Sequence, residues 1–78
     1  MWAIFQEETP VAVFKTNVRS SMDASYVLHH LMIEYPDSRV TIDLMDCDKV
    51  LRIEGNVVSP DEIKTHLKGF GYRCEELD

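Results

Sequence analysis

The sequence predicts an α+β fold in which two helices alternate with four strands, in the order strand, helix, strand, strand, helix, strand. Two segments, around residues 22–34 and 60–70, carry apolar side chains at helical spacing. Residues 39–45 and 50–54 alternate apolar and polar side chains, as half-buried strands do. Residues that favour helix N-termini precede both helical segments, so the N-cap residues and the spacing of the apolar side chains predict the same two helices.

The first predicted strand covers residues 11–16 and is apolar on both faces before Lys15, which is typical of a central strand. We expect its even-numbered residues to face the core, leaving Val11 and Val13 on the other face. Residues 1–9 are interpreted as a short extra strand or as an arm packed on the domain. Residues 10–78 are expected to form one domain, without an internal linker.

A loop and a capped helix follow this strand. Ser20 and Ser21 are both good N-cap residues, and Asp23 complements the positive end of the helix in its first turn. Residues 22–34 are expected to be helical, because one stripe of apolar side chains recurs there: Ala24, Val27, Leu28 and Leu31. Pro36 ends the helix, since the residue before a proline disfavours the α conformation.

A β-hairpin comes next. Val40, Ile42 and Leu44 should share one face of a strand over residues 39–45. Residues 46–49 have the composition of a turn, and residues 50–54 alternate again, so the two strands should pair.

The second helix has the strongest local signal in the chain. Ser59 is a predicted N-cap, Pro60 suits the first helical position, and Glu62 would complete a capping box. Gly69 or Gly71 should supply the left-handed residue at its end, before an edge strand over residues 72–77. The buried side should contain Ile63, Leu67 and Phe70.

This order of elements is the split βαβ, or ferredoxin-like, arrangement. Right-handed crossovers then predict an antiparallel βαββαβ sandwich with sheet order 4-1-3-2 and both helices on one face of the sheet.

With this topology, residues 11–77 resemble the heavy-metal-associated domain, a family that includes small copper chaperones and modules of copper-pumping ATPases. The resemblance rests on the order of four segments: Asp43-Leu44, residues 49–55, residues 59–63, and Gly71-Tyr72. It implies a metal motif, Met-x-Cys-x-x-Cys, in the first loop. Val18 falls at the methionine, whereas Ser20 and Asp23 fall at the two cysteines. Copper(I) prefers thiolates, so we expect no bound metal and no cofactor.

The other potential ligands are scattered. Cys47 lies in the predicted hairpin turn and Cys74 on the opposite edge strand, roughly 14 Å away across three strand spacings, so both should be free thiols. We expect Cys47 to be exposed and Cys74 to be partly buried. His29 and His30 diverge on one helix, and His66 stands alone on the other.

Composition excludes several classes of function. The net charge of −6, from 14 acidic and 8 basic residues, disfavours nucleic acid as a partner. No apolar run approaches the roughly 20 residues of a membrane span, and the first residues do not resemble a signal peptide. The sequence therefore indicates a cytoplasmic protein, and no catalytic set of residues is recognisable in it.

The sequence therefore predicts a non-catalytic module that binds another protein or associates with itself. The first candidate surface is the altered loop, formed by Val18, Arg19, Ser20, Ser21, Met22 and Asp23. The second is the open face of the sheet, with Val11, Val13 and Met45, which Trp2, Ile4 and Phe5 could cover. The third is Tyr72, which matches an aromatic residue near the family's metal loop.

Two alternatives stay open. One is a metal-handling protein with unusual ligands, drawn from Asp23, His30, Glu34 and Cys47. The other is a regulatory domain that senses a small ligand, as other ferredoxin-like domains do at dimer interfaces. Fold alone does not separate these functions.

Overall fold

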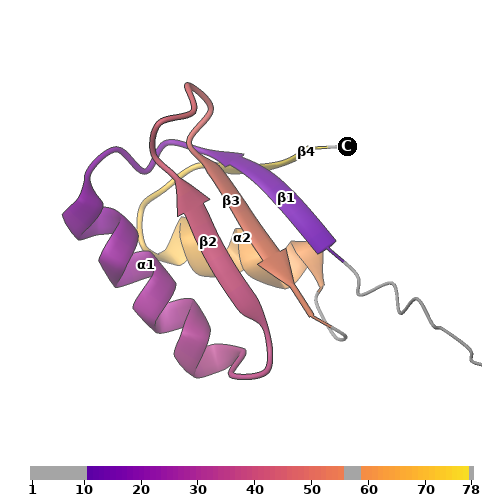
Figure 1. Ribbon diagram of the computed structural model, residues 1–78. Helices are drawn as coiled ribbons and strands as arrows, with labels where there is room; N and C mark the ends of the chain where they lie inside the picture. Colours follow the sequence, from indigo (N-terminus) through magenta and orange to yellow (C-terminus); the bar gives the residue numbers. More distant parts are fainter. Residues whose placement is uncertain (1–10, 56–58, 78) are drawn as a thin grey trace, which may run out of the picture.

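The computed structural model describes residues 11–55 and 59–77, which form one antiparallel sheet and two helices (Figure 1). In chain order the elements are β1 (Val11–Thr16), α1 (Ser21–Glu34), β2 (Arg39–Asp43), β3 (Val50–Glu54), α2 (Pro60–Gly69) and β4 (Cys74–Leu77). This order confirms the predicted one. The predictions for residues 1–10, including the extra strand or arm, lie outside the described residues.

The sheet has the order β2-β3-β1-β4, and each neighbouring pair is antiparallel. This is the predicted order, read from the other edge. In the register of the sheet, Phe14 lies opposite Leu51, and Leu51 lies opposite Ile42. Residues that face the core are therefore aligned across three strands. The arrangement is compatible with a ferredoxin-like fold.

The core lies between the sheet and the helices. On β1, Phe14 and Thr16 are buried whereas Val11 is 48% exposed, so the predicted facing of this strand is confirmed. Both helices contribute to the same hydrophobic cluster and therefore cover the same face of the sheet. The buried apolar residues are Phe14, Val18, Ala24, Val27, Leu31, Leu51, Ile53, Ile63 and Leu67.

The ends of two strands differ from the prediction. β2 stops at Asp43, because the carboxylate of Asp43 accepts a hydrogen bond from the backbone N–H of Met45 (3.0 Å) and turns the chain. β4 begins at Cys74 rather than Tyr72, because the preceding residues complete the end of α2. There Gly71 has φ 93°, so it is the left-handed residue and Gly69 is not.

Two backbone hydrogen bonds close this helix end. The N–H of Gly71 donates to the carbonyl of Lys68 (3.0 Å), and the N–H of Tyr72 donates to the carbonyl of Leu67 (2.9 Å). This pair of bonds is the Schellman motif, which satisfies carbonyls that the helix itself leaves free.

The predicted capping box at the start of α2 is wrong. Ser59 occupies the N-cap position, but its side chain caps no backbone N–H. The carboxylate of Glu62 instead accepts a hydrogen bond from the Tyr35 hydroxyl (2.8 Å), so this glutamate links the end of α1 to α2. Pro60 has no N–H to satisfy, which reduces the need for a side-chain cap.

Thr16 is the buried polar residue of the core, and three hydrogen bonds satisfy it. Its hydroxyl donates to the carbonyl of Lys49 (2.6 Å) and accepts from the N–H of Val18 (3.3 Å). Its own N–H donates to the carbonyl of Asp48 (3.0 Å). Thr16 thus joins the end of β1 to the β2–β3 loop and to the loop that leads into α1.

Replacing Thr16 with valine keeps the shape of the side chain but leaves the Lys49 carbonyl and the Val18 N–H without a partner. We expect Thr16→Val to lower the free energy of unfolding by roughly 1–3 kcal/mol, measured by urea denaturation. Thr16→Ser keeps the hydroxyl and should lose about 0.8 kcal/mol, from one methyl group. Hydrogen exchange at the Val18 amide should accelerate in the valine variant only; equal protection in both variants would contradict this role.

Candidate functional site

The loop between β1 and α1 stands where the resemblance places a metal motif, and its own hydrogen bonds hold it in place. The Ser20 hydroxyl accepts from the N–H of Asp23 (3.0 Å), so Ser20, not Ser21, caps α1. The side-chain oxygen of Asn17 accepts from the N–H of Arg73 (2.8 Å), which ties the loop to the start of β4. Val18 is buried in the core.

This burial corrects the predicted interaction surface, because a fully buried Val18 offers nothing to a partner. Arg19, Ser20, Ser21 and Met22 are exposed. Of the other two residues near this loop, Asp23 is half-buried, and Tyr72 is half-buried and packs against the core. Desolvation, followed by the neighbouring Asp23 carboxylate, raises the pKa of Tyr72.

The open face of the sheet is mixed rather than apolar. Val13 lies on it between Leu77 of β4 and Arg52 of β3, and Arg52 in turn lies opposite Thr41 of β2. Lys15, on the same face, lies 3.9 Å from the carboxylate of Asp48. Met45 is 94% exposed but belongs to the β2–β3 loop, not to the sheet face. Charged and polar side chains therefore break up the expected apolar patch.

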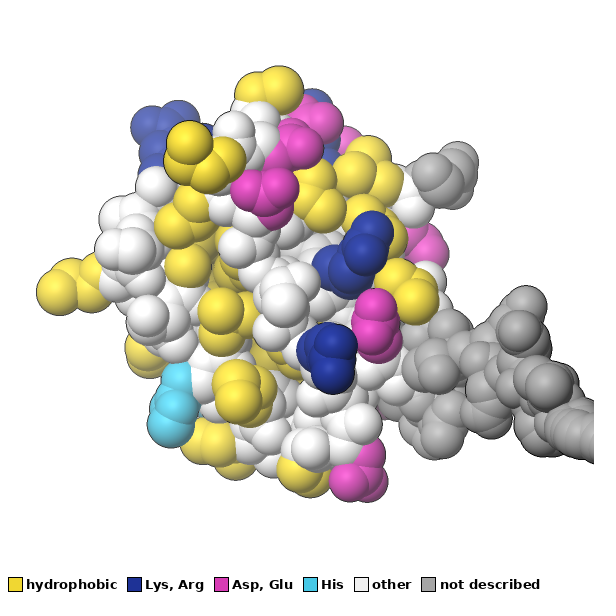
Figure 2. Space-filling view, viewed as in Figure 1, with side chains coloured by type: hydrophobic (Ala, Val, Ile, Leu, Met, Phe, Trp, Pro, Cys, Tyr) yellow, Lys and Arg dark blue, Asp and Glu magenta, His cyan; other side chains and the backbone are white. Residues whose placement is uncertain are grey.

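The outer face of α1 is the more apolar surface. Met22 is 80% exposed, Tyr26 57%, Met32 54% and Ile33 63%. Figure 2 shows hydrophobic side chains gathered over the side of the molecule where α1 lies, with a histidine among them. The sequence prediction placed only the buried stripe of this helix. A second stripe, at residues 22, 26, 29 and 33, carries three apolar side chains and one histidine and was the signal that could have indicated this face.

Aromatic and histidine rings fill the seam between α1 and α2. The ring of His30 packs edge-on against Phe70, with centroids 4.6 Å apart, and lies 6.3 Å from the ring of His66. His66 also packs edge-on against Tyr35, at 5.7 Å. His66 is the one histidine of α2, as expected, but its ring lies close to the rings of His30 on α1 and of Tyr35 at the end of α1, contacts that the sequence did not reveal.

Tyr35 closes one end of this seam. Partial burial, then the hydrogen bond to Glu62 and the charges of Glu62 and Glu34, raise the pKa of Tyr35 to about 12. The seam places His30 beside Phe70 and His66. Of the other alternative metal ligands, Asp23 lies in the first turn of α1, Glu34 at the end of this helix and Cys47 in the β2–β3 loop. Among the described residues these candidates do not form one ligand cluster.

One group of potential ligands does converge, at Asp46, Cys47 and Asp48, whose ligand atoms lie within 4.8 Å of one another. Turn geometry accounts for this arrangement. The carboxylate of Asp46 accepts from the N–H of Asp48 (2.8 Å), and Asp48 forms an ion pair with Lys15. Cys47 is exposed, as predicted.

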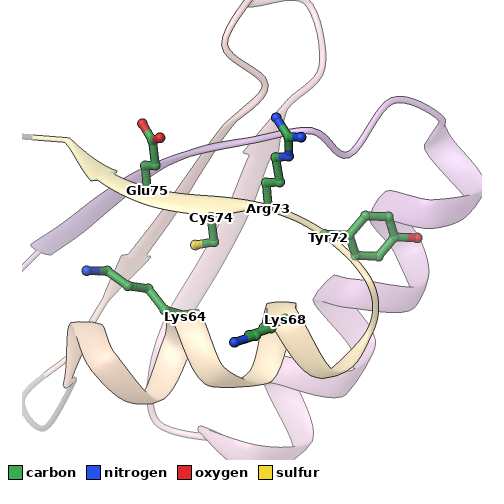
Figure 3. Close-up of a pocket in the computed structure, with 6 residues that line it drawn as sticks. All are labelled: Lys64, Lys68, Tyr72, Arg73, Cys74 and Glu75. Carbon is green, nitrogen blue, oxygen red and sulfur yellow. The ribbon is translucent and has the colours of Figure 1, made fainter.

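A shallow pocket of about 360 Å³ lies between α2 and β4 (Figure 3). Cys74 points into it, whereas Arg73 and Glu75 project from the other side of the strand and Tyr72 points toward α1. The three basic side chains that line the pocket, Lys64, Lys68 and Arg73, therefore do not converge on one ligand.

Cys74 itself is half-buried and free, as predicted. Burial raises the pKa of its thiol to about 11, although nearby Lys64 opposes the shift. A thiol with this pKa is almost entirely protonated near neutral pH and is a poor nucleophile. The pocket thus holds no activated group.

Comparisons with known proteins leave the family open, since no family model, no curated protein and no solved structure matches this chain.

In the described part of the chain, neither helix has the length and apolar character needed to cross a membrane.

Removing the cap of α1 should be measurable. We expect Ser20→Ala to lower the free energy of unfolding by roughly 0.5–2 kcal/mol, because the N–H of Asp23 loses its acceptor. The matched control is Ser21→Ala, at an exposed position next to the cap, which should change stability by less than about 0.5 kcal/mol. Denaturant unfolding of the metal-free protein tests both; similar losses in the two variants would contradict the assignment of the cap.

The two thiols should react at different rates. At about pH 8, an alkylating reagent should modify exposed Cys47 well before Cys74, because burial both shields Cys74 and raises its pKa. Peptide mass spectrometry after timed quenching distinguishes the sites. In denaturant the difference should disappear; if Cys74 reacts as fast as Cys47 in the folded protein, its half-buried position between β4 and α2 is wrong.

Proposed function

We propose that this chain is a non-catalytic protein-binding module of ferredoxin-like topology, resembling a heavy-metal-associated domain that has lost its metal ligands. The observation that carries the proposal is the exposed apolar face of α1, formed by Met22, Tyr26, Met32 and Ile33. Fully burying a side chain of this size contributes about 1.5–3 kcal/mol. Four of them on one helix are a typical feature of a contact surface.

The loop beside this surface supports the loss of metal binding. The Ser20 hydroxyl already accepts the hydrogen bond that caps α1, and the Asp23 N–H donates it. A serine hydroxyl and a carboxylate are hard oxygen ligands that suit copper(I) poorly. The loop is complete without an ion, because Asn17, Val18 and Ser20 are each held by the protein itself.

The other surfaces support the proposal less well. The sheet face alternates apolar residues with Arg52 and Lys15, and the pocket beside β4 directs its charges in different directions. The net charge of −6 argues against nucleic acid as the partner. The proposed setting is the cytoplasm, where reducing conditions would keep Cys47 and Cys74 as free thiols.

Restoring the family's thiolates tests the lost metal site. The double substitution Ser20→Cys with Asp23→Cys should create copper(I) binding with one ion per chain, because it rebuilds the Cys-x-x-Cys motif at the start of a helix. The parent and each single cysteine variant should bind much more weakly. Competition with a copper(I) chelator measures this. Tight binding by the parent that Ser20→Ala abolishes would refute the proposal.

Site-specific crosslinking in cells tests the protein-binding surface. A photoreactive amino acid placed at Met22 or Ile33 should give adducts with protein, because both side chains project from the exposed face of α1. The matched control is the same amino acid at Thr41, an exposed position on the open sheet face. Adducts of equal yield from Thr41, or none from either α1 position, would contradict the proposed surface.

A further inference from the structure

We infer that the protein bound by the outer face of α1 is a second copy of this chain, which packs its own α1 antiparallel against the first. This inference rests on the proposed function and names the partner of the same surface. Three features of α1 support it: the spacing of its exposed side chains, their symmetry about the middle of the helix, and the charges at its two ends.

The exposed stripe has the spacing of a helix pair. Met22, Tyr26, His29 and Ile33 follow one another at intervals of four, three and four residues, and all four are exposed. This alternation of four and three is the spacing of side chains along a coiled-coil seam. The opposite side of α1, with Ala24, Val27 and Leu31, is already buried in the core.

The stripe is also symmetric about the midpoint of α1, between Val27 and Leu28. A two-fold axis through that midpoint makes the stripe complementary to itself, as the interface of a symmetric dimer must be. It would place Met22 against the partner's Ile33, and Tyr26 against the partner's His29. The ring of Tyr26 packs edge-on against Phe70, with centroids 5.4 Å apart, and remains 57% exposed.

The charges at the two ends of α1 favour the antiparallel arrangement. Exposed Arg19 precedes the N-terminus of the helix, and exposed Glu34 ends it, with no basic residue in the last turn. Each charge has the same sign as the helix-dipole end beside it, which is unfavourable within one chain. In an antiparallel pair, Arg19 lies near the partner's Glu34 and near the negative end of the partner's helix.

The outer face of α2 does not have these properties. Apart from Gly69, its exposed residues are polar or charged: Asp61, Glu62, Thr65 and Lys68. Helix pairing is therefore expected through α1. A helix of 14 residues is about 21 Å long, which gives a small interface of the weak, concentration-dependent class.

Sedimentation equilibrium of the purified chain tests the inference, at about 0.15 M salt so that the net charge is screened. The parent should pass from monomer to dimer as its concentration approaches the millimolar range. Ile33→Asp should weaken the dimer at least about tenfold, or ~1.4 kcal/mol. The matched control is Met45→Asp, which adds the same charge at a position that is 94% exposed but lies off the stripe, and it should leave the dimer unchanged. Circular dichroism checks that both variants fold.

A charge-reversal pair tests the direction of packing. Arg19→Glu and Glu34→Arg should each weaken self-association, because each places like charges together at both ends of the pair. Mixed in equal amounts, the two variants should form a heterodimer at least as readily as the parent forms its homodimer. If mixing restores nothing, the antiparallel register is wrong.

The outcomes separate this inference from the proposed function. A parent that stays monomeric at every concentration, or a dimer that Ile33→Asp leaves intact, overturns pairing through α1. Crosslinks from Met22 and Ile33 to a different polypeptide would then still support a protein-binding surface. Crosslinks from these positions to a second copy of the chain would support both the protein-binding surface and pairing through α1. With the crosslinker at Met22, the substitution Ile33→Asp should abolish these crosslinks.

Discussion

The hydroxyl of Thr16 is the constraint on which the positions of the β1–α1 loop and the β2–β3 loop depend. It sits in the core at the end of β1 and bonds to Lys49 on one side and Val18 on the other. A buried hydroxyl without partners would be costly, so both loops must keep the backbone positions that satisfy it. Lys49 accordingly holds φ 47°, a conformation that non-glycine residues seldom adopt. The start of α1 is thus positioned by a bond to a loop 33 residues further along the chain.

This constraint changes how the loop before α1 is understood. In the family that the sequence resembles, an ion would draw this loop together. Here Val18 is anchored in the core, Asn17 bonds to Arg73, and Ser20 caps the helix. These contacts hold the loop against the start of α1, and the exposed apolar side chains lie on the helix itself.

The spacing of apolar residues predicted the order of the strands and helices. Most of these elements bury one face, and the residues on a buried face recur at a regular interval in the sequence. β1 has no such alternation, because it is apolar on both faces before Lys15; burial of Phe14 and Thr16 beside exposed Lys15 shows which face meets the core. The capping box failed because Glu62 bonds to Tyr35, 27 residues away, and no local pattern reveals that contact. The contacts of His66 with His30 and Tyr35 went unrecognised for the same reason. The outer face of α1 was overlooked because its exposed apolar side chains do not contribute to the core.

The position of β1 in the sheet has a consequence for how the chain acquires its structure during synthesis. β1 is made first, yet it lies between β3 and β4, so its partners are Val50–Glu54 and Cys74–Leu77. Until β4 has been made, one edge of an apolar strand has no partner. Such contacts between distant segments slow folding and leave strand edges exposed to other chains. The nascent protein is thus vulnerable to aggregation before β4 emerges, and slower elongation between β3 and β4 would prolong that period.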